Sequence, residues 1–183
     1  MKTITIMLAA FLGMSIGQIL AQSPNTSNKE KMEIFSNWTG HWQGEGSMKQ
    51  GPGEAKRSVV DEYIELKLEG NILLIEGIGK SHDPATQQDK IVHHALGILS
   101  FDANSGTYQF KSYLNNGRST EAWFNVTAEN NFEWGFDIPT GGKTKYSIRI
   151  DPVQNTWNEI GKFSRDGTTW MKFFEMNLKK VAD

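Results

Sequence analysis

Hydrophobic and polar residues alternate along most of the chain after Gly40, with the period of two that is typical of a half-buried strand. In 132–138, FEWGFDI, the aromatic and aliphatic residues fall on one face and Glu133, Gly135 and Asp137 on the other. The segments 59–68 and 108–114 alternate in the same way. One apolar and one polar face per strand indicate an antiparallel sheet.

Short turn motifs separate these strands. Asn116-Gly117 and Asp166-Gly167 tolerate the positive φ of tight hairpins, and 81–89, SHDPATQQD, is predicted to be the one longer loop. Counting the intervening runs gives about ten strands in up-and-down order. Because closure hides both edges of such a sheet, we predict an all-β, single antiparallel up-and-down β-barrel. A jelly-roll sandwich, the alternative, needs long crossovers that the sequence lacks.

One short helix is predicted before the barrel. Ser27 and Glu30 have the spacing of a capping box, and Met32 and Phe35 then share one helical face. These residues predict a helix over 28–36. The domain organisation is therefore a flexible lead over 22–27 and a barrel domain over 28–183.

The first residues have the pattern of a secretory signal peptide over 1–21. Lys2 precedes an apolar run that ends at Ala21, the expected residue before cleavage. An uncleaved membrane anchor is the alternative, but Gly13, Gly17 and Gln18 interrupt the apolar run and favour cleavage. The chain contains no cysteine, which excludes disulfides and thiolate chemistry. We expect a periplasmic or secreted bacterial protein with no membrane span after cleavage.

The distribution of charge argues against a nucleic-acid partner. The formal net charge is −2, and no basic run is present to face phosphates. The sequence also lacks a nucleophile elbow, a phosphate-binding glycine loop and a dinucleotide fingerprint. These absences leave the side chains of the barrel interior as the candidate site.

Ionisable residues inside the barrel are the candidates for chemistry. His93 and His94 point to opposite faces of a strand and cannot share one ion, so no metal site is predicted. His94 shares a face with Leu96 and is expected to point inward. Glu62 falls on the apolar face of its own strand, and Glu62 with His94 forms the sharpest catalytic hypothesis. The alternative is a carboxylate neutralised by Lys or Arg at the rim.

The segment 40–46, GHWQGEG, carries a resemblance to known proteins. Gly40 and Trp42, placed after a short helix, resemble the G-x-W start of the calycin superfamily, which includes lipocalins and fatty-acid-binding proteins. The longer pattern with Gly44 and Gly46 resembles the first strand of nitrobindin-like barrels. The tail over 157–181 is similar to secreted bacterial calycin-like proteins of unassigned function.

The resemblance implies roles for several of these residues. Trp42 would pack across the closed end of the barrel under a cationic side chain, supplied by Lys179 or Lys180 at the end of the last strand. Gly44 and Gly46 would let the first strand bend around the barrel.

Two departures from the resembling families narrow the function. Nitrobindin-like proteins bind haem through a His in a late strand, but every His here lies at or before 94, so no haem cofactor is expected. Fatty-acid-binding proteins carry a two-helix lid between their first two strands, where this chain has only the turn at 51–53.

The inward aromatic residues are the best functional lead, because apolar walls with a few polar groups are what a small-molecule pocket needs. We expect a secreted, lipocalin-like barrel that binds a small, mostly apolar molecule in its interior, with His94 or Glu62 as a polar handle. An enzyme that uses an inward Glu or His as acid and base is one alternative, and a filled barrel that acts as an envelope interaction module is another. The expected cavity lining consists of Glu62, His94, Tyr108, Phe110, Trp134, Phe136, Tyr146, Trp157, Phe163 and Phe174.

Overall fold

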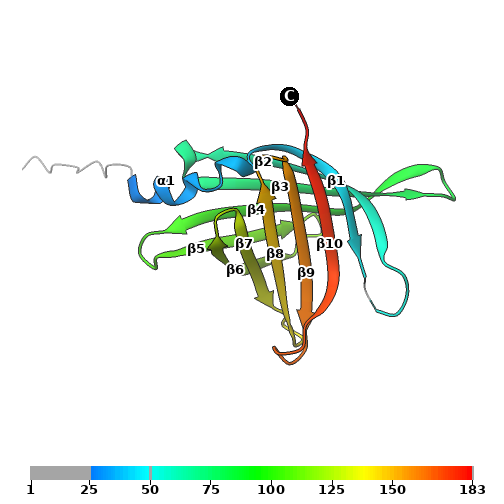
Figure 1. Ribbon diagram of the computed structural model, residues 1–183. Helices are drawn as coiled ribbons and strands as arrows, with labels where there is room; N and C mark the ends of the chain where they lie inside the picture. The colour runs from blue at the N-terminus through cyan, green and yellow to red at the C-terminus, as the bar shows by residue number, and fades with distance from the viewer. Residues whose placement is uncertain (1–25, 50, 183) are drawn as a thin grey trace, which may run out of the picture.

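A computed structural model describes residues 26–49 and 51–182. Ten antiparallel strands close into one barrel in the order β1-β10-β9-β8-β7-β6-β5-β4-β3-β2, which confirms the predicted all-β, up-and-down fold (Figure 1). The predicted signal peptide and residues 22–25 of the lead lie outside the described residues. The strands are β1 (Gly40–Met48), β2 (Lys56–Lys67), β3 (Ile72–Asp83), β4 (Gln88–Asp102), β5 (Thr107–Leu114), β6 (Ser119–Ala128), β7 (Asn131–Asp137), β8 (Lys143–Asp151), β9 (Thr156–Ser164) and β10 (Met171–Lys180).

The predicted helix is present in two pieces, α1 (Thr26–Glu33) and the 3₁₀ turn η1 (Ser36–Trp38). A second 3₁₀ turn, η2 (Leu68–Gly70), joins β2 to β3. The regular helix thus begins and ends earlier than the predicted 28–36. Met32, Phe35 and Trp38 are spaced by three residues and are at most 1% exposed. This spacing suits the tighter 3₁₀ turn, in which the Trp38 amide donates to the Phe35 carbonyl at 2.9 Å.

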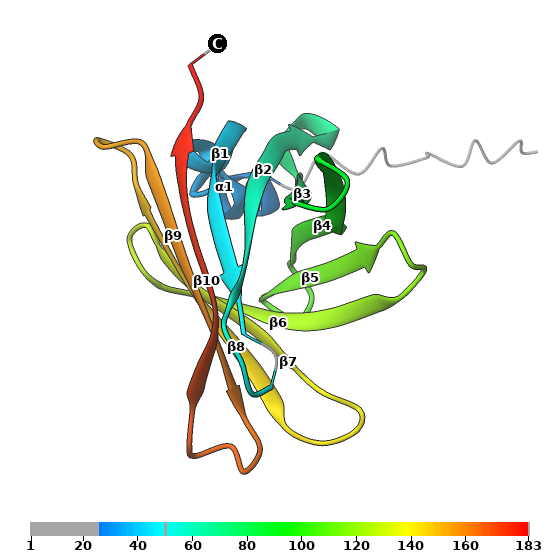
Figure 2. The ribbon, with the colours of Figure 1, turned by 90° about the vertical axis from the view of Figure 1, so that its right-hand side faces the viewer.

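The three buried side chains Met32, Phe35 and Trp38, called the plug below, close one end of the barrel. The Phe35 ring contacts the rings of Trp38 and Phe132 at centroid distances of 5.4 Å each. The Trp42 indole N–H donates to the Trp38 carbonyl at 2.6 Å, which fixes the plug to β1. Figure 2 shows α1 at the upper end of the barrel, opposite the β1–β2, β7–β8 and β9–β10 turns.

The first and last strands join to close the barrel, with Trp42 paired to Lys180 and Met48 to Phe174. Gly44 lies where the two strands approach most closely, because a Cβ added there would be 2.1 Å from the Asn177 carbonyl oxygen. Close packing of backbones at the closing seam therefore explains Gly44, whereas Gly46 leaves room for the Val60 side chain of β2.

The predicted loop over 81–89 is wrong, because strand pairing continues through most of it. β3 runs to Asp83 and β4 begins at Gln88, so a four-residue turn remains. His82 Nδ1 lies 3.2 Å from Asp89 Oδ1 across the hairpin and supports the extra pairing. The hairpin projects beyond the barrel wall, on the right in Figure 1.

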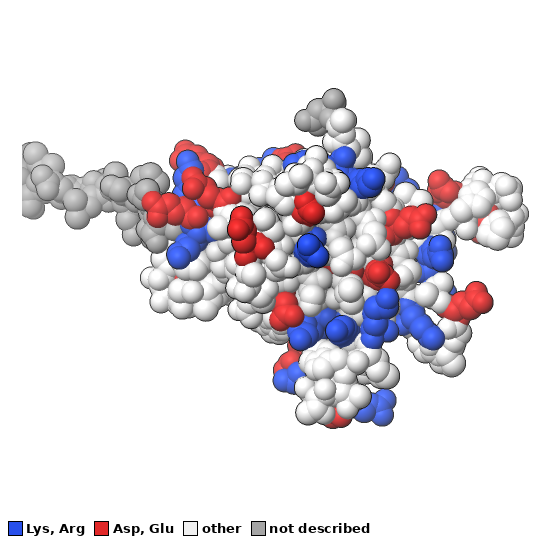
Figure 3. Space-filling view, viewed as in Figure 1, with Lys and Arg blue, Asp and Glu red and all other residues white. Residues whose placement is uncertain are grey.

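Acidic and basic side chains are interspersed over the face in Figure 3. No helix in the described part of the chain is long and apolar enough to cross a membrane.

Candidate functional site

Strand register decides which side chains face the barrel interior, because directly paired residues point to the same side of a sheet. Trp134 pairs with Phe124 on one side and with Tyr146 on the other, and Tyr146 pairs in turn with Gly161. Nine of the ten expected lining residues lie on this inner face. They are Glu62, Tyr108, Phe110, Trp134, Phe136, Tyr146, Trp157, Phe163 and Phe174.

Two of the nine belong to the closed end rather than to an open interior. The Tyr108 hydroxyl donates to the Lys31 carbonyl at 2.8 Å and so holds α1 in place. Trp157 is 3% exposed and packs against Trp38 with ring centroids 4.7 Å apart. Both side chains therefore complete the core around the plug.

Beyond the plug, inward side chains keep part of their surface accessible. Phe110, Trp134, Phe174 and Ile75 are half-buried although they point towards the barrel axis, and so is Tyr146. A filled interior would leave such side chains fully buried. Solvent-accessible space therefore borders these inward side chains.

Inward-facing glycines create part of this space. Three lining side chains lie flat against the wall because the paired or neighbouring residue on the next strand is glycine, and we call them the glycine-backed side chains. A Cβ added at each glycine would clash with the side chain above it. The pairs are Glu62 over Gly77, Phe110 over Gly97 and Tyr146 over Gly161, with nearest side-chain atoms 2.6, 2.9 and 2.7 Å from the added Cβ. The glycines are visible in the sequence, but alternation alone does not reveal what covers them.

Two aromatic rings of the interior form a parallel stack. The rings of Trp134 and Tyr146 lie 4.0 Å apart at an interplanar angle of 5°. Phe110 meets Trp134 edge-on at 5.1 Å, and Phe174 meets Tyr146 at 5.9 Å. These contacts fix the rings in one arrangement, which is the preorganisation that a binding wall needs.

Two carboxyl groups face the same interior. Glu159 is 6% exposed, and its Oε1 accepts a hydrogen bond from the Trp134 indole N–H at 2.9 Å. Burial raises the pKa of Glu159 to about 7, against the opposing effect of the Trp134 and Trp157 indoles. The Trp157 N–H is near this carboxylate but falls outside hydrogen-bond geometry.

Glu62 differs from Glu159 in having no partner among the described residues. Burial raises the pKa of Glu62 to about 8, and the negative charges of Glu159 and Asp61 add to the effect. The side chain nevertheless retains some accessible surface, so it borders the unfilled space. A carboxyl group of this kind is a proton donor near neutral pH unless a cation joins it.

The expected inward position of His94 is wrong. His94 lies on the outer wall, where its Nε2 is 2.9 Å from Glu76 Oε1. His93 faces inward instead, beside Gly79 near the open end, and partial burial lowers its pKa. The error arises because the inward positions of β4 next to His93 are small, with glycine at 97 beneath the Phe110 ring. Next to His94, the larger apolar residues Leu96 and Ile98 therefore lie on the outer face, although Leu99 further along β4 points inward.

Glu62 and His94 lie on opposite faces of the wall, so the predicted catalytic pair of these two residues is not formed. Glu62 instead faces the interior with Glu159, whose negative charge raises the pKa of Glu62. Strand alternation places each carboxyl group on the inner face of its own strand, but it does not bring the two together, since they are 97 residues apart in the chain.

Of the two lysines expected to cover Trp42, Lys180 does so and Lys179 does not. Lys180 Nζ lies 5.3 Å from the Trp42 ring centroid, and Lys179 pairs with Gln43 on the outer face. Gly40 has φ +117° and leaves room for the Lys180 side chain, whose Cε would be 2.9 Å from an added Cβ. The alternation of β10 fixes which lysine points inward.

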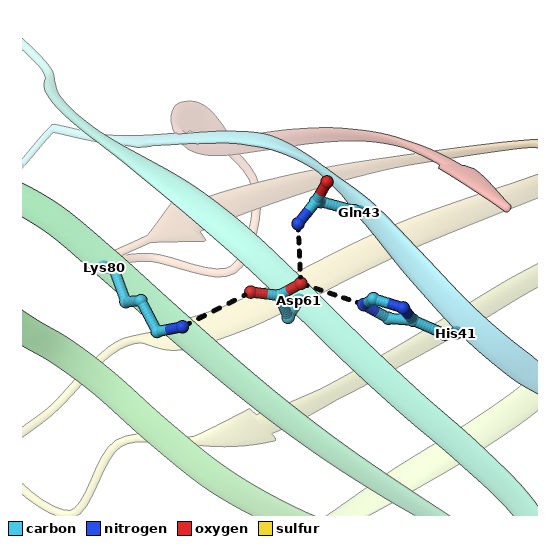
Figure 4. Close-up of polar contacts among 4 residues, drawn as sticks. All are labelled: His41, Gln43, Asp61 and Lys80. Atoms are coloured by element: carbon cyan, nitrogen blue, oxygen red, sulfur yellow. Dashed lines mark hydrogen bonds and ion pairs between the residues drawn. The ribbon is translucent and has the colours of Figure 1, made fainter. Parts of the chain in front are cut away.

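The outer wall carries a separate polar network on β1, β2 and β3 (Figure 4). Asp61 Oδ1 accepts hydrogen bonds from His41 Nε2 at 2.9 Å and from Gln43 Nε2 at 3.0 Å, and Lys80 Nζ lies 3.7 Å from Oδ2. Burial acts to raise the pKa of Asp61, but the hydrogen bonds and Lys80 outweigh it and the pKa is lowered. All four groups are satisfied by one another, so this network ties three strands together.

The outer wall also has a groove of about 450 Å³ over β6, β7 and β8. Trp123 and Trp170 flank it, and Gly135 lies on its floor, where an added Cβ would be 2.7 Å from the Trp123 ring. Lys145 Nζ lies 5.3 Å from the Trp170 ring. Nothing in the sequence singles out this outer surface, because neither face of β6 is clearly apolar.

Within residues 26–49 and 51–182, no group of three or more His, Asp or Glu side chains is arranged to hold a metal. The expectations of no metal and no haem stay predictions.

No protein-family model matches the sequence, and no curated protein matches it. Among solved structures, the M. tuberculosis protein Rv2717c has a TM-score of 0.59 at 14% identity, over 82% of this chain and 97% of that one. A protein of unknown function from the DUF3598 family of Nostoc punctiforme covers 82% and 98% at 8% identity, but its TM-score of 0.23 supports no argument. The chain therefore shares its barrel fold with Rv2717c, and that likeness shows the fold alone.

Proposed function

We propose that this protein is a secreted, calycin-like barrel that binds a small, mostly apolar molecule in its interior beyond the plug. The observation that carries the proposal is the set of inward aromatic rings that stay half-buried, namely Phe110, Trp134, Tyr146 and Phe174. Apolar ligand surface that covers these rings would contribute about 25 cal/mol per Å² before association costs.

The fixed arrangement of the rings supports binding with little reorganisation. The Trp134–Tyr146 stack already occupies one geometry, and the glycine-backed side chains lie against the wall. A ligand would therefore lose little affinity to ordering of the site. Glu62 remains a proposed polar handle and Glu159 takes the place of His94, because both glutamates face the interior and His94 does not.

Export from the cytoplasm is part of the proposal. The apolar segment before Ala21 supports it, and a domain with a large aromatic core can be stable outside the cytoplasm without disulfides. Recovery of the full-length gene product from periplasm or medium, with a mature N-terminus at Gln22, is the expected result in a bacterial host.

Binding is tested first by native mass spectrometry of gently purified protein, where we expect a stoichiometric extra mass. Trp134→Ala should then weaken binding of an apolar fluorescent dye about five- to thirtyfold, because the loss of one stacking ring costs about 1–2 kcal/mol. Trp123→Ala, on the outer wall beside Trp134 in the next strand, is the matched control and should leave dye affinity unchanged.

Equal dye affinity in the two tryptophan variants and the parent protein would contradict an interior site. Weaker binding in Trp123→Ala alone would favour the second candidate function, an interaction module that uses the outer wall. The groove flanked by Trp123 and Trp170 is the observation that supports this alternative.

A further inference from the structure

The interior has an imbalance of charge that its own residues do not correct. Glu62 and Glu159 both face it, and neither forms an ion pair with any described residue. Glu159 receives an indole N–H from Trp134, which supplies a hydrogen bond but no charge. Glu62 receives no hydrogen bond from the part of the chain that the structure describes. Carboxyl groups in such surroundings are costly to ionise until a positive group arrives.

The charged groups that face this region do not supply that cation. Lys180 lies over Trp42 at the plug end, and His93 lies near the open end, where burial followed by the neighbouring His94 lowers its pKa. Asp61, the neighbour of Glu62 on the same strand, is negative and belongs to the outer network. The phenol of Tyr146 is neutral, since burial and then Glu159 raise its pKa.

The remaining walls favour a positive group as well. The aromatic faces of Trp134, Tyr146 and Phe110 carry negative electrostatic potential that attracts ammonium ions when water is excluded. Gly77 leaves room for the Glu62 carboxylate to lie flat, within 3 Å of where a Cβ would stand. The carboxylate therefore borders the unfilled space instead of occupying it. Carboxylates beside fixed aromatic rings match an apolar molecule that ends in an ammonium group.

We propose that the interior ligand is a small organic cation, an ammonium group on an apolar body, held by Glu62 and Glu159 as counter-ions and by the aromatic rings beside them. This inference rests on the proposed function and specifies its ligand class. The two glutamates lie on β2 and β9, and the aromatic rings come from β5, β7 and β8, so the site exists only in the closed barrel.

Three naphthalene probes of one shape test the charge preference. 1-Naphthylmethylamine is a cation at neutral pH, 1-naphthylmethanol is neutral and 1-naphthoic acid is an anion. Calorimetric titration of the full chain at pH 8 should give at least tenfold tighter binding of the amine than of the alcohol, with the acid weakest. The preference for the amine should shrink at pH 6, where both glutamates hold their protons.

Glu62→Gln should reduce the preference for the amine over the alcohol about tenfold while alcohol affinity stays within twofold. Glu65→Gln, an exposed carboxyl on the same strand, is the matched control and should leave the preference intact. Glu159→Gln provides a second variant that keeps an acceptor for the Trp134 N–H. Circular dichroism of each variant verifies that the barrel is folded.

The outcomes separate this inference from the proposed function. Equal binding of amine and alcohol by the parent protein would overturn the cation preference and leave an apolar carrier. A preference that survives both glutamine variants would overturn the role of the carboxyl groups. Failure of all three probes to bind would overturn the cation inference together with the interior site.

Discussion

At the scale of single residues, the interior places a carboxyl group beside aromatic rings, with no counter-ion in the described part of the chain. Carboxyl groups are rarely buried without a partner, yet Glu62 has none among the described residues. The cost of this arrangement depends on protonation, because a neutral carboxylic acid is much cheaper to bury than a carboxylate. The pH dependence of stability therefore reports on the interior directly.

Glu62→Gln should make the protein less sensitive to pH. The pKa of Glu62 is about 8 in the folded protein against an ordinary value of 4.5, so the folded state holds the proton more tightly than the unfolded chain does. The contribution of Glu62 to the stability of the parent protein is then greatest below pH 4.5, and it declines as the pH rises towards 8. We expect the variant to gain on the order of 3 kcal/mol relative to the parent between pH 5 and pH 8.

Urea unfolding followed by tryptophan fluorescence measures this difference, with Glu65→Gln as the exposed control. Glu159 remains in both proteins and contributes the same sign of dependence, which the comparison removes. A constant difference between parent and variant across this pH range would show that Glu62 ionises normally.

At the scale of elements, α1 and η1 depend on the side chains that they bury in the barrel and do not form an independently stable helix. An eight-residue helix is too short to be stable alone in water. Its stability derives from the plug, whose rings meet Tyr108, Phe124 and Phe132 on three different strands. The spacing of Met32 and Phe35 predicted this helix, and the packing of Trp38 explains why its last turn tightens.

Phe35→Ala should lower the free energy of unfolding by about 3–5 kcal/mol, because it removes a fully buried ring and leaves a cavity. Its neighbour Ile34 is 40% exposed, and Ile34→Ala should cost less than about 1 kcal/mol. Thermal or denaturant unfolding of the pair measures both. Similar small losses would mean that the plug is not part of the cooperative core.

At the scale of the whole molecule, barrel closure depends on one tight seam between β1 and β10. The alternation and turn chemistry of the sequence were sufficient to predict strand number, order and closure. The inner face of β4 around His93 was not predictable from hydrophobicity, because the inward residues there, Ala95 and Gly97, are small and the Phe110 ring of β5 lies over Gly97. The choice between Lys179 and Lys180 likewise needed the register of the last strand.

Gly44→Ala should open this seam. The added Cβ would meet backbone atoms, the Asn177 oxygen at 2.1 Å and the Leu178 Cα at 2.9 Å, which cannot rotate away as a side chain can. We expect a loss on the order of 1–3 kcal/mol and faster amide hydrogen exchange along β1 and β10. The exposed neighbour Glu45→Ala serves as the control. Unchanged amide hydrogen exchange in Gly44→Ala would show that β1 and β10 do not pack tightly at Gly44.

The glycine-backed side chains have a consequence for how this barrel can diversify. At Glu62, Phe110 and Tyr146, the width of the interior depends on the glycine that lies behind the side chain. Glycine has only a hydrogen atom where other residues have a Cβ. Exchange of one such glycine for alanine would push an entire ring or carboxyl group towards the axis without altering any residue that meets a bound molecule. Descendants of this sequence can thus change what fits inside through positions that a contact map of the ligand would never include.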